Sequence, residues 1–368
     1  MKAKKGFVEV QFNWIFVLFV GGLLLIFFTS VVLKQKAVSE KSVSASALKS
    51  VESIISSSIG VTLDTTNAVK ISKTEIGYLC NSISVKDVSV NYNGLIMFAP
   101  NVLKGTNLTI QTKIFDIPFR AANFLIASTD DVRYIFVYDD SNPNSNTLKK
   151  NIEDSLSNKF NREFVGKSEI ENIKDMKNYK VRFVFLYGVD LSTNTEIKNL
   201  LNIFSKMPDK DVTAVKFKGN IDYKTIIDYG TIEYYKKKYD KNANTNIWIP
   251  IGTQNSVNYL KIPSLLGAIF MDSGIDTVSE YNCVMDNVIN RIKLVSNVLS
   301  NRIDEINPPS NPQFPKCNTE YTSATSTLTT FNMDINNIKS SPSSLIFNIN
   351  QIKLQNDNLQ SKSCPLIY

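Results

Sequence analysis

The sequence contains no histidine, and this absence removes several classes of enzyme. A chain without an imidazole cannot form a Ser-His-Asp or Cys-His nucleophile pair, a histidine-ligated zinc site or an imidazole general base. Most common hydrolase designs are therefore excluded. Chemistry based on carboxylates, lysine, tyrosine or an oxygen-ligated metal remains open to this chain.

Glycine is also scarce, with 14 residues in the whole chain. The sequence contains no GxGxxG, no Walker A motif and no CxxC pair. Loops that hold a phosphate through backbone amides need such glycines, because the backbone must approach the ligand closely. We therefore expect no cofactor, and no catalytic motif indicates that the chain is an enzyme.

Long apolar runs are missing from all but one part of the chain. Residues 12–33, FNWIFVLFVGGLLLIFFTSVVL, are 22 consecutive residues without a charged side chain. As a helix they would span about 33 Å, close to the hydrocarbon thickness of about 30 Å. Trp14 lies near one end, where an indole prefers the headgroup level. The run predicts a transmembrane helix that follows a basic tail at residues 1–11.

A secretory signal peptide is the competing interpretation, because lysines precede the apolar run. The apolar part of a signal peptide is usually about 7–15 residues long and ends at small residues. Here the run is longer and leads directly into Lys34-Gln35-Lys36. We therefore expect an uncleaved signal anchor with a single span.

Lysines lie on both sides of the span and do not decide on which side the body lies. Four cysteines, an even number that allows two disulfides, and the glycosylation sequence Asn107-Leu108-Thr109 favour an oxidising exterior. Unpaired core thiols in a reducing compartment are the alternative. We expect a cell-membrane protein with its amino terminus in the cytoplasm and its body outside. Its expected partners are the lipid bilayer and other envelope proteins.

The net charge is +7, and its densest basic patch is Tyr234-Tyr235-Lys236-Lys237-Lys238-Tyr239. In a cytosolic protein, lysines interleaved with aromatic residues would suggest nucleic-acid binding. Outside a cell that partner is missing, so we expect no nucleic-acid binding. We interpret the patch as the end of a strand with solvated lysines.

After the span, the apolar spacing of a helix continues to Ser58, and Gly60 lies where a helix would end. Residues 34–60 are therefore predicted to form a helical stalk. Residues 61–130 change to short β-branched and aromatic runs separated by Asn, Gly and Pro, which predicts a β-rich segment. Within it, Asn93-Gly94 predicts a hairpin turn.

Residues 131–272 alternate between apolar runs and helical patterns. VRYIFVYD and YKVRFVFLYGVD are nearly continuous apolar runs, and amphipathic stretches follow them at residues 148–160 and 196–204. This alternation predicts a parallel-type α/β layer, a sheet covered by helices on both faces. Ligands of such sheets bind at the carboxyl ends of the strands.

Apolar residues in 273–368 recur mostly at alternating spacings of three and four. Three such stretches, at residues 278–306, 321–338 and 345–359, are separated by NPPSNPQFP and by Pro342. They predict a helical hairpin or three-helix bundle, with Ser341 as the cap of a helix that begins at Pro342. We favour packing within one chain over an intermolecular coiled coil. The fold class expected for the whole chain is mixed α/β.

Two Asp-x-Ser sequences end the two apolar runs of the α/β layer: Asp139-Asp140-Ser141 and Asp190-Leu191-Ser192. This arrangement is similar to the metal site of von Willebrand A-type domains, where carboxylate and hydroxyl oxygens hold a divalent cation. The second serine of that pattern is replaced here by Pro143 and Asn194. Asp139, Ser141 and Asp190 are candidate metal ligands, and helix capping is the favoured interpretation.

Four cysteines allow three disulfide connectivities. If the tail helices run up, down and up, the helix that ends near Lys362 finishes where the second helix begins, so that Cys364 lies beside Cys317. Cys80 then remains for Cys283, near the start of the first tail helix. One bridge would close the bundle, and the other would tie it to the β-rich segment.

The amino terminus resembles the class III leader of type IV pilins, in which a basic segment ends at glycine and an apolar helix drives assembly. Lys4-Lys5-Gly6-Phe7 is followed by Glu9 and the apolar run, with Glu9 third after Gly6 rather than fifth. Over most of the chain, the segments EVQFNWIFVL, MFAPNVLKG, LLGAIF and KSCPLIY are similar to a family of uncharacterised single-pass membrane proteins from archaea. That resemblance implies an anchored architecture and brings no activity with it.

We therefore expect a single-pass anchored protein with a structural or interaction role in the cell envelope. A pilin-like subunit is the first alternative, and processing of the amino terminus would identify it. A surface enzyme or metal-dependent adhesin that uses the Asp139 region is the second, and bound Mg²⁺ or Ca²⁺ would identify it.

Overall fold

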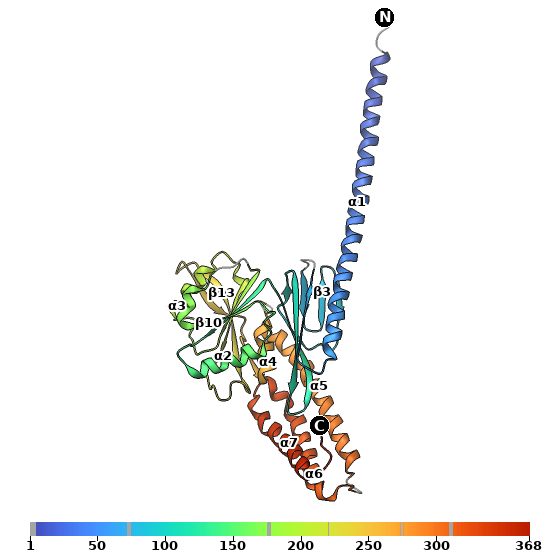
Figure 1. Cartoon of the computed structure of the whole chain (residues 1–368). Helices are drawn as coiled ribbons and strands as arrows, with labels where there is room; N and C mark the ends of the chain where they lie inside the picture. Colours follow the sequence, from blue (N-terminus) through green and yellow to red (C-terminus); the bar gives the residue numbers. More distant parts are fainter. Residues whose placement is uncertain are drawn as a thin grey trace.

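A computed structural model of the chain describes residues 5–71, 75–174, 178–219, 221–272, 274, 276–308 and 312–368, without the side chains of residues 5–13, 37, 40 and 195. It confirms a mixed α/β architecture with a long apolar helix at the amino terminus, β-sheets, and helices at the carboxyl terminus. In Figure 1, helix α1 leads away from a body in which the carboxyl-terminal helices lie at the opposite end.

Helix α1 (Lys5–Ile59) contains 55 residues, so the expected span and stalk form one unbroken helix. It begins inside the stretch expected to be a basic tail, and residues 1–4, with the start of the pilin-like leader, lie outside the described residues. Side chains from Trp14 to Ser30 are all exposed, whereas Leu48, Val51 and Ile55 are buried against the β-rich segment. By length and composition, α1 is the one described helix able to cross a membrane.

The β-rich segment forms two four-stranded sheets, with strand orders β1-β7-β8-β5 and β4-β3-β2-β6. The strands are β1 (Thr65–Lys70), β2 (Ile76–Leu79), β3 (Ser82–Val85), β4 (Val88–Asn91), β5 (Met97–Phe98), β6 (Val102–Leu103), β7 (Asn107–Asp116) and β8 (Arg120–Thr129). The hairpin predicted at Asn93-Gly94 is wrong, because β4 and β5 on its two sides belong to different sheets. Met97 and Phe98 are both buried, and β5 pairs with β8 in the core.

The α/β layer contains a seven-stranded sheet of order β10-β9-β11-β12-β13-β14, with β15 also paired to β13. Its strands are β9 (Val132–Tyr138), β10 (Arg162–Gly166), β11 (Lys180–Phe185), β12 (Val212–Phe217), β13 (Tyr229–Asp240), β14 (Thr245–Pro250) and β15 (Ser256–Leu260). The expected parallel sheet is only partly correct, because β13, β14 and β15 pair antiparallel. The turn between β13 and β14 is too short for the crossover that a parallel pair needs.

Alternate residues of the central strands enter two different cores. Tyr134 and Phe136 of β9 contribute to the large core shared with the rest of the body, whereas Ile135 and Val137 contribute to a smaller core on the other face. Helix α2 (Pro143–Ser155) covers the first face, and α3 (Thr195–Ile203) covers the second together with the short helix η1 (Lys167–Asn172). Helices thus cover both faces, as expected.

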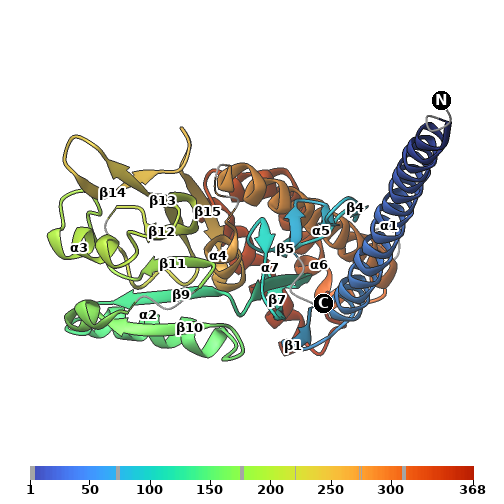
Figure 2. The same cartoon turned by 90° about the horizontal axis from the view of Figure 1, so that it is seen from above.

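Helix α4 joins the α/β layer to the rest of the body, and Figure 2 shows it between the two. It spans Lys261–Phe270 and contacts β15 on one side and β7 and β8 on the other. The ring of Phe270 stacks on Tyr134 with centroids 4.3 Å apart. A side chain at Gly267 would lie 2.8 Å from the ring of Phe98, so only glycine allows this close packing.

The carboxyl-terminal helices are α5 (Thr277–Ile306), α6 (Asn318–Asp334) and α7 (Ser343–Ser361), with the short helices η3 (Pro315–Cys317) and η4 (Ile335–Lys339). The apolar residues that defined the second and third stretches are buried within the chain: Tyr321, Ala324, Leu328, Phe331, Ile335, Ile338, Leu345, Ile349, Ile352 and Leu359. The expected cap at Ser341 is wrong, because α7 begins at Ser343, with Pro342 at the cap position and no side-chain cap. The carbonyl of Ser341 instead accepts from Ser344.

Candidate functional site

The candidate metal ligands lie at the carboxyl ends of β9 and β11, each in a tight turn. The carboxylate of Asp139 accepts hydrogen bonds from the amide of Ser141 at 3.1 Å and from its hydroxyl at 2.6 Å. Asp190 does the same for Ser192, at 2.8 and 2.6 Å. In both turns one carboxylate oxygen is already occupied by the residue two positions later.

The helix caps are asparagines rather than the aspartates favoured from the sequence. The side-chain oxygen of Asn142 accepts from the amides of Asn144 and Ser145, 2.9 and 3.4 Å away, at the start of α2. Asn194 accepts from the amide of Ile197 at 3.0 Å at the start of α3. An N-cap must lie directly before the first helical residue, and the aspartates lie three to four residues too early.

Neighbouring carboxylates at this edge are held by hydroxyl groups in the same way. Asp140 accepts from the Ser168 hydroxyl after β10, and this hydrogen bond lowers the pKa of Asp140. Hydrogen bonds from the hydroxyl and amide of Ser192 lower the pKa of Asp190 to about 2. These carboxylates therefore stay ionised, and their role is to stabilise turns by accepting hydrogen bonds from nearby residues.

No three His, Cys, Asp or Glu side chains lie close enough together to hold a metal ion among the residues that the structure describes. Asp139 and Asp190 thus lack a third carboxylate or thiolate partner there. A divalent hard cation needs about six oxygen ligands, several of them usually carboxylates. The arrangement at the carboxyl edge suits turn formation better than metal binding.

We expect calorimetric titration with Mg²⁺ or Ca²⁺ to give no saturable binding to the purified chain. Asn142→Ala should lower the free energy of unfolding by about 0.5–2 kcal/mol, because the first amides of α2 lose their acceptor. Denaturant unfolding of the variant measures this loss. Micromolar cation binding that disappears in Asp139→Ala would contradict this interpretation and favour the adhesin.

A buried ionic cluster lies where the α/β layer meets the rest of the body. The carboxylate of Asp272, fully buried after α4, lies 3.1 Å from the Lys180 ammonium and 2.8 Å from the Arg182 guanidinium of β11. Arg182 also donates to the carbonyl of Met271 at 2.8 Å, and Thr213 of β12 donates to Asp272 at 2.9 Å. Strands β11 and β12 and the segment after α4 are therefore joined at one point.

Burial alone would raise the pKa of Asp272, but Lys180 and Arg182 outweigh it and lower the pKa to about 2. The backbone carbonyl of Asp272 also accepts from the amide of Asn101 in the β-rich segment, at 3.0 Å. This cluster was not predicted from the sequence. Its signal was two basic residues, Lys180 and Arg182, at alternate positions of an otherwise apolar strand, which need a buried acid.

The basic patch at residues 234–239 differs from its expected role as a solvated strand end. Lys237 is buried, and its ammonium donates to the carbonyls of Phe204 and Met207 just after α3, at 3.0 and 2.6 Å. A cation at the carboxyl end of a helix donates hydrogen bonds to free carbonyls and interacts favourably with the helix dipole. Lys238 is exposed, as expected. The patch therefore serves partly to hold α3 against the sheet.

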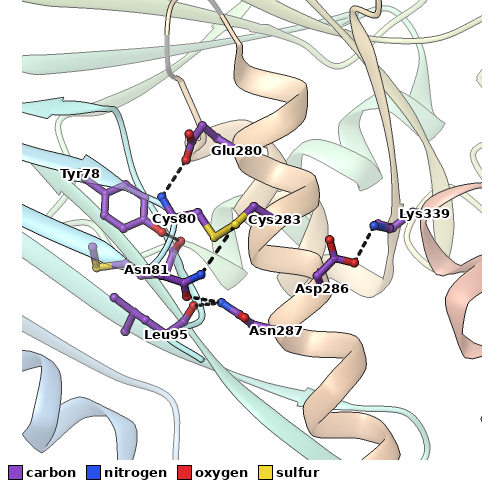
Figure 3. Close-up of a disulfide and its surroundings, with 10 residues drawn as sticks. Tyr78, Cys80, Asn81, Leu95, Glu280, Cys283, Asp286, Asn287 and Lys339 are labelled. Atoms are coloured by element: carbon purple, nitrogen blue, oxygen red, sulfur yellow. Dashed lines mark hydrogen bonds and ion pairs between the residues drawn. A yellow bond between two sulfur atoms is a disulfide. The ribbon is translucent and has the colours of Figure 1, made fainter. Parts of the chain in front are cut away.

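The structure forms two disulfides, Cys80–Cys283 and Cys317–Cys364, which are the two pairs predicted from the sequence. Figure 3 shows the first of them, which joins the turn between β2 and β3 to α5. Beside it, Glu280 accepts from the amide of Cys80 at 2.7 Å, and Asn287 donates to the carbonyl of Leu95 at 2.9 Å. Side-chain hydrogen bonds thus flank the bridge on both sides along α5.

The glycosylation sequence gives no support to an exterior location. The side-chain amide of Asn107 donates to the carboxylate of Asp130 at 2.8 Å and to the hydroxyl of Thr106 at 3.2 Å. Thr109 is buried. An acceptor asparagine must be free at the surface, and this one is engaged in the sheet.

A cavity of about 650 Å³ opens between the end of α1, the start of β8 and the middle of α5. Its floor is apolar and includes Ile96, Ala121 and Ala122. Arg120 and Arg291 lie at its rim, and none of its lining residues is acidic. The cavity therefore holds no paired acid and base, and it does not suggest a catalytic site.

Comparison with models of known protein families finds no match to this chain, and searches of curated proteins and of solved structures find none either.

Proposed function

We propose that this chain is a single-pass, membrane-anchored protein whose body lies outside the cytoplasm and has a structural or interaction role in the cell envelope. The observation that carries this proposal is the free half of α1. From Trp14 to Leu33 it is apolar, and no part of the described body covers it. Apolar surface in water costs about 25 cal/mol for each Å², and a bilayer is the surrounding that removes this cost.

The two disulfides support the proposed exterior location. Disulfides form and persist in oxidising compartments and are rare in the cytoplasm. Here all four cysteines are paired, and the closed loops have sequence separations of 203 and 47 residues. Closing loops of this length strongly restricts the unfolded chain. The body is therefore most stable in a compartment where its thiols are oxidised.

Protease added to intact cells tests this topology. We expect cleavage of the body after about Lys34 while cytosolic control proteins remain whole. The products should be separated under reducing conditions, because the disulfides would otherwise hold cut pieces together. Complete protection of the chain, with cleavage only after lysis, would place the body in the cytoplasm.

A pilin-like subunit is the second candidate, and the two halves of α1 favour it. The carboxyl-terminal half is fixed to the body through Leu48, Val51 and Ile55, so the free apolar half is rigidly joined to it. Such a helix could assemble with copies of itself as well as cross a bilayer. The mass of the amino-terminal peptide separates the two, since cleavage after Gly6 would favour the pilin and an intact terminus the anchor.

A further inference from the structure

A short segment of α1, residues 34–43, lies between its apolar half and the part that packs on the body. All described side chains of this segment are exposed, and Ser44 is the first buried residue of the helix after it. It contains three exposed lysines, Lys34, Lys36 and Lys41, called here the stalk lysines. The ion pairs between described residues do not include them.

The stalk lysines surround the helix instead of marking one side of it. With about 3.6 residues for each turn, Lys34 and Lys41 face almost the same way, and Lys36 faces the opposite way. A protein docked on one side of the stalk would therefore meet only part of this charge. Lipid headgroups surround a helix at the membrane surface and can meet all of it.

The direction of the helix also brings these lysines toward the membrane. Side chains of an α-helix lean toward its amino terminus, and for the stalk lysines that is the direction of the apolar half. Lys34 directly follows the apolar run, and Lys36 and Lys41 lie about 3 and 11 Å further along the axis. Charges within about 8 Å of each other interact at physiological salt. Lys34 and Lys36 are therefore the two stalk lysines closest to charged lipid headgroups at the end of the apolar run.

We propose that the stalk lysines bind the phosphate groups of anionic lipids in the leaflet that faces the body. This inference rests on the proposed function, because it requires α1 to cross the bilayer. It gives the lysines after the span a partner that the described body does not offer. It also fixes how far α1 can slide through the membrane, and therefore the distance between the body and the lipid surface.

The test uses the full-length chain in nanodiscs that contain equal amounts of phosphatidylglycerol and phosphatidylcholine. After mild release, native mass spectrometry measures the ratio of the two lipids that remain bound. We expect the wild type to retain phosphatidylglycerol preferentially. The triple variant Lys34→Gln, Lys36→Gln and Lys41→Gln should lower this ratio at least about fivefold, the effect expected from a single lysine at an anionic surface.

A second triple variant, Lys224→Gln, Lys238→Gln and Lys241→Gln, is the matched control. These three lysines are also exposed, and they lie on the α/β layer, so net charge changes equally. The control should keep the wild-type ratio. An unchanged ratio in the stalk variant would overturn the inference, and so would an equal loss in the control.

Two further measurements identify the source of the phosphate and separate this inference from the proposed function. Saturable binding of inorganic phosphate to the detergent-solubilised wild type, lost in the stalk variant, would assign the lysines to a free anion and overturn the lipid site. Alkaline carbonate treatment reports on the span alone. Wild-type chain released by carbonate overturns both proposals, whereas inserted chain without a lipid preference overturns only the inference about lipids.

Discussion

Replacing Phe19 and Leu24 together by lysine is expected to release the chain from membranes. Each lysine near the centre of a membrane helix costs about 2.5–3.5 kcal/mol on insertion scales, or about 5–7 kcal/mol for the pair. In the folded chain the two side chains are 68% and 52% exposed. The body does not pack on them, so the variant should change membrane insertion and leave the fold of the body intact.

Alkaline carbonate extraction of isolated membranes measures this effect, and circular dichroism of the released variant shows whether its body is folded. Met333→Lys with Leu354→Lys is a suitable control. These residues are 68% and 50% exposed on α6 and α7, so the control adds the same charge away from the apolar half of α1. It should stay in the membrane pellet. A wild type that carbonate extracts, or a Phe19/Leu24 variant that remains inserted, would disprove the span.

Asp272→Asn is expected to lower the free energy of unfolding of the detergent-solubilised chain by about 3–5 kcal/mol. The substitution keeps the shape of the side chain but leaves Lys180 and Arg182 buried without the carboxylate that pairs with both. Denaturant unfolding followed by circular dichroism measures the loss. Glu75→Gln, which breaks the exposed pair with Lys104, should have a much smaller effect, because solvent screens that pair.

The same cluster predicts how stability depends on pH. The pKa of Asp272 is about 2 in the folded chain, below its ordinary value of 3.8. A carboxyl group with a lowered pKa stabilises the fold fully above its ordinary pKa, and this contribution disappears as the pH falls toward the lowered value. The wild type should therefore lose stability between about pH 4 and pH 2. Asp272→Asn should lack this part of the loss, and an identical acid profile in both would contradict the cluster.

The parts of the fold that were predictable from the sequence depend on local periodicity. The apolar run at residues 12–33 and the spacing that follows it predicted one helix, and α1 extends from Lys5 to Ile59. The spacing of three and four in the tail predicted residues that are buried in α5, α6 and α7. In both regions the repeat of the helix places apolar side chains on the correct face without knowledge of distant partners.

Features that depend on distant partners could not be predicted in this way. Strand β13 pairs antiparallel with β12 and β15 as well as with β14, and its own residues do not indicate which strands lie beside it. The buried position of Lys237 depends on the carbonyls just after α3, some thirty residues away. Arg182 and Asp272 are separated by 90 positions. The basic residues of β11 indicate that a buried acid must lie nearby, but not which acid it is.

The candidate site shows the same division. The sequence correctly placed Asp139 at the end of a strand, because it directly follows the apolar run that forms β9. The turns that Asp139 and Asp190 close with the serines two positions later were not predicted. The helix caps were assigned to the wrong residues, since α2 begins at Pro143 after Asn142 and α3 begins at Thr195 after Asn194. Boundaries that differ by a few residues decide which side chain reaches the free amides.

The bridge between Cys80 and Cys283 shortens the covalent path between the carboxyl-terminal helices and α1. Tension on α6 or α7 passes along α5 to Cys283, crosses to Cys80, and continues through β2 and β1 to α1. Residues 81–282, which include the whole α/β layer, lie outside this covalent path. Force applied to the carboxyl-terminal helices can therefore reach α1 through covalent bonds that bypass the α/β layer.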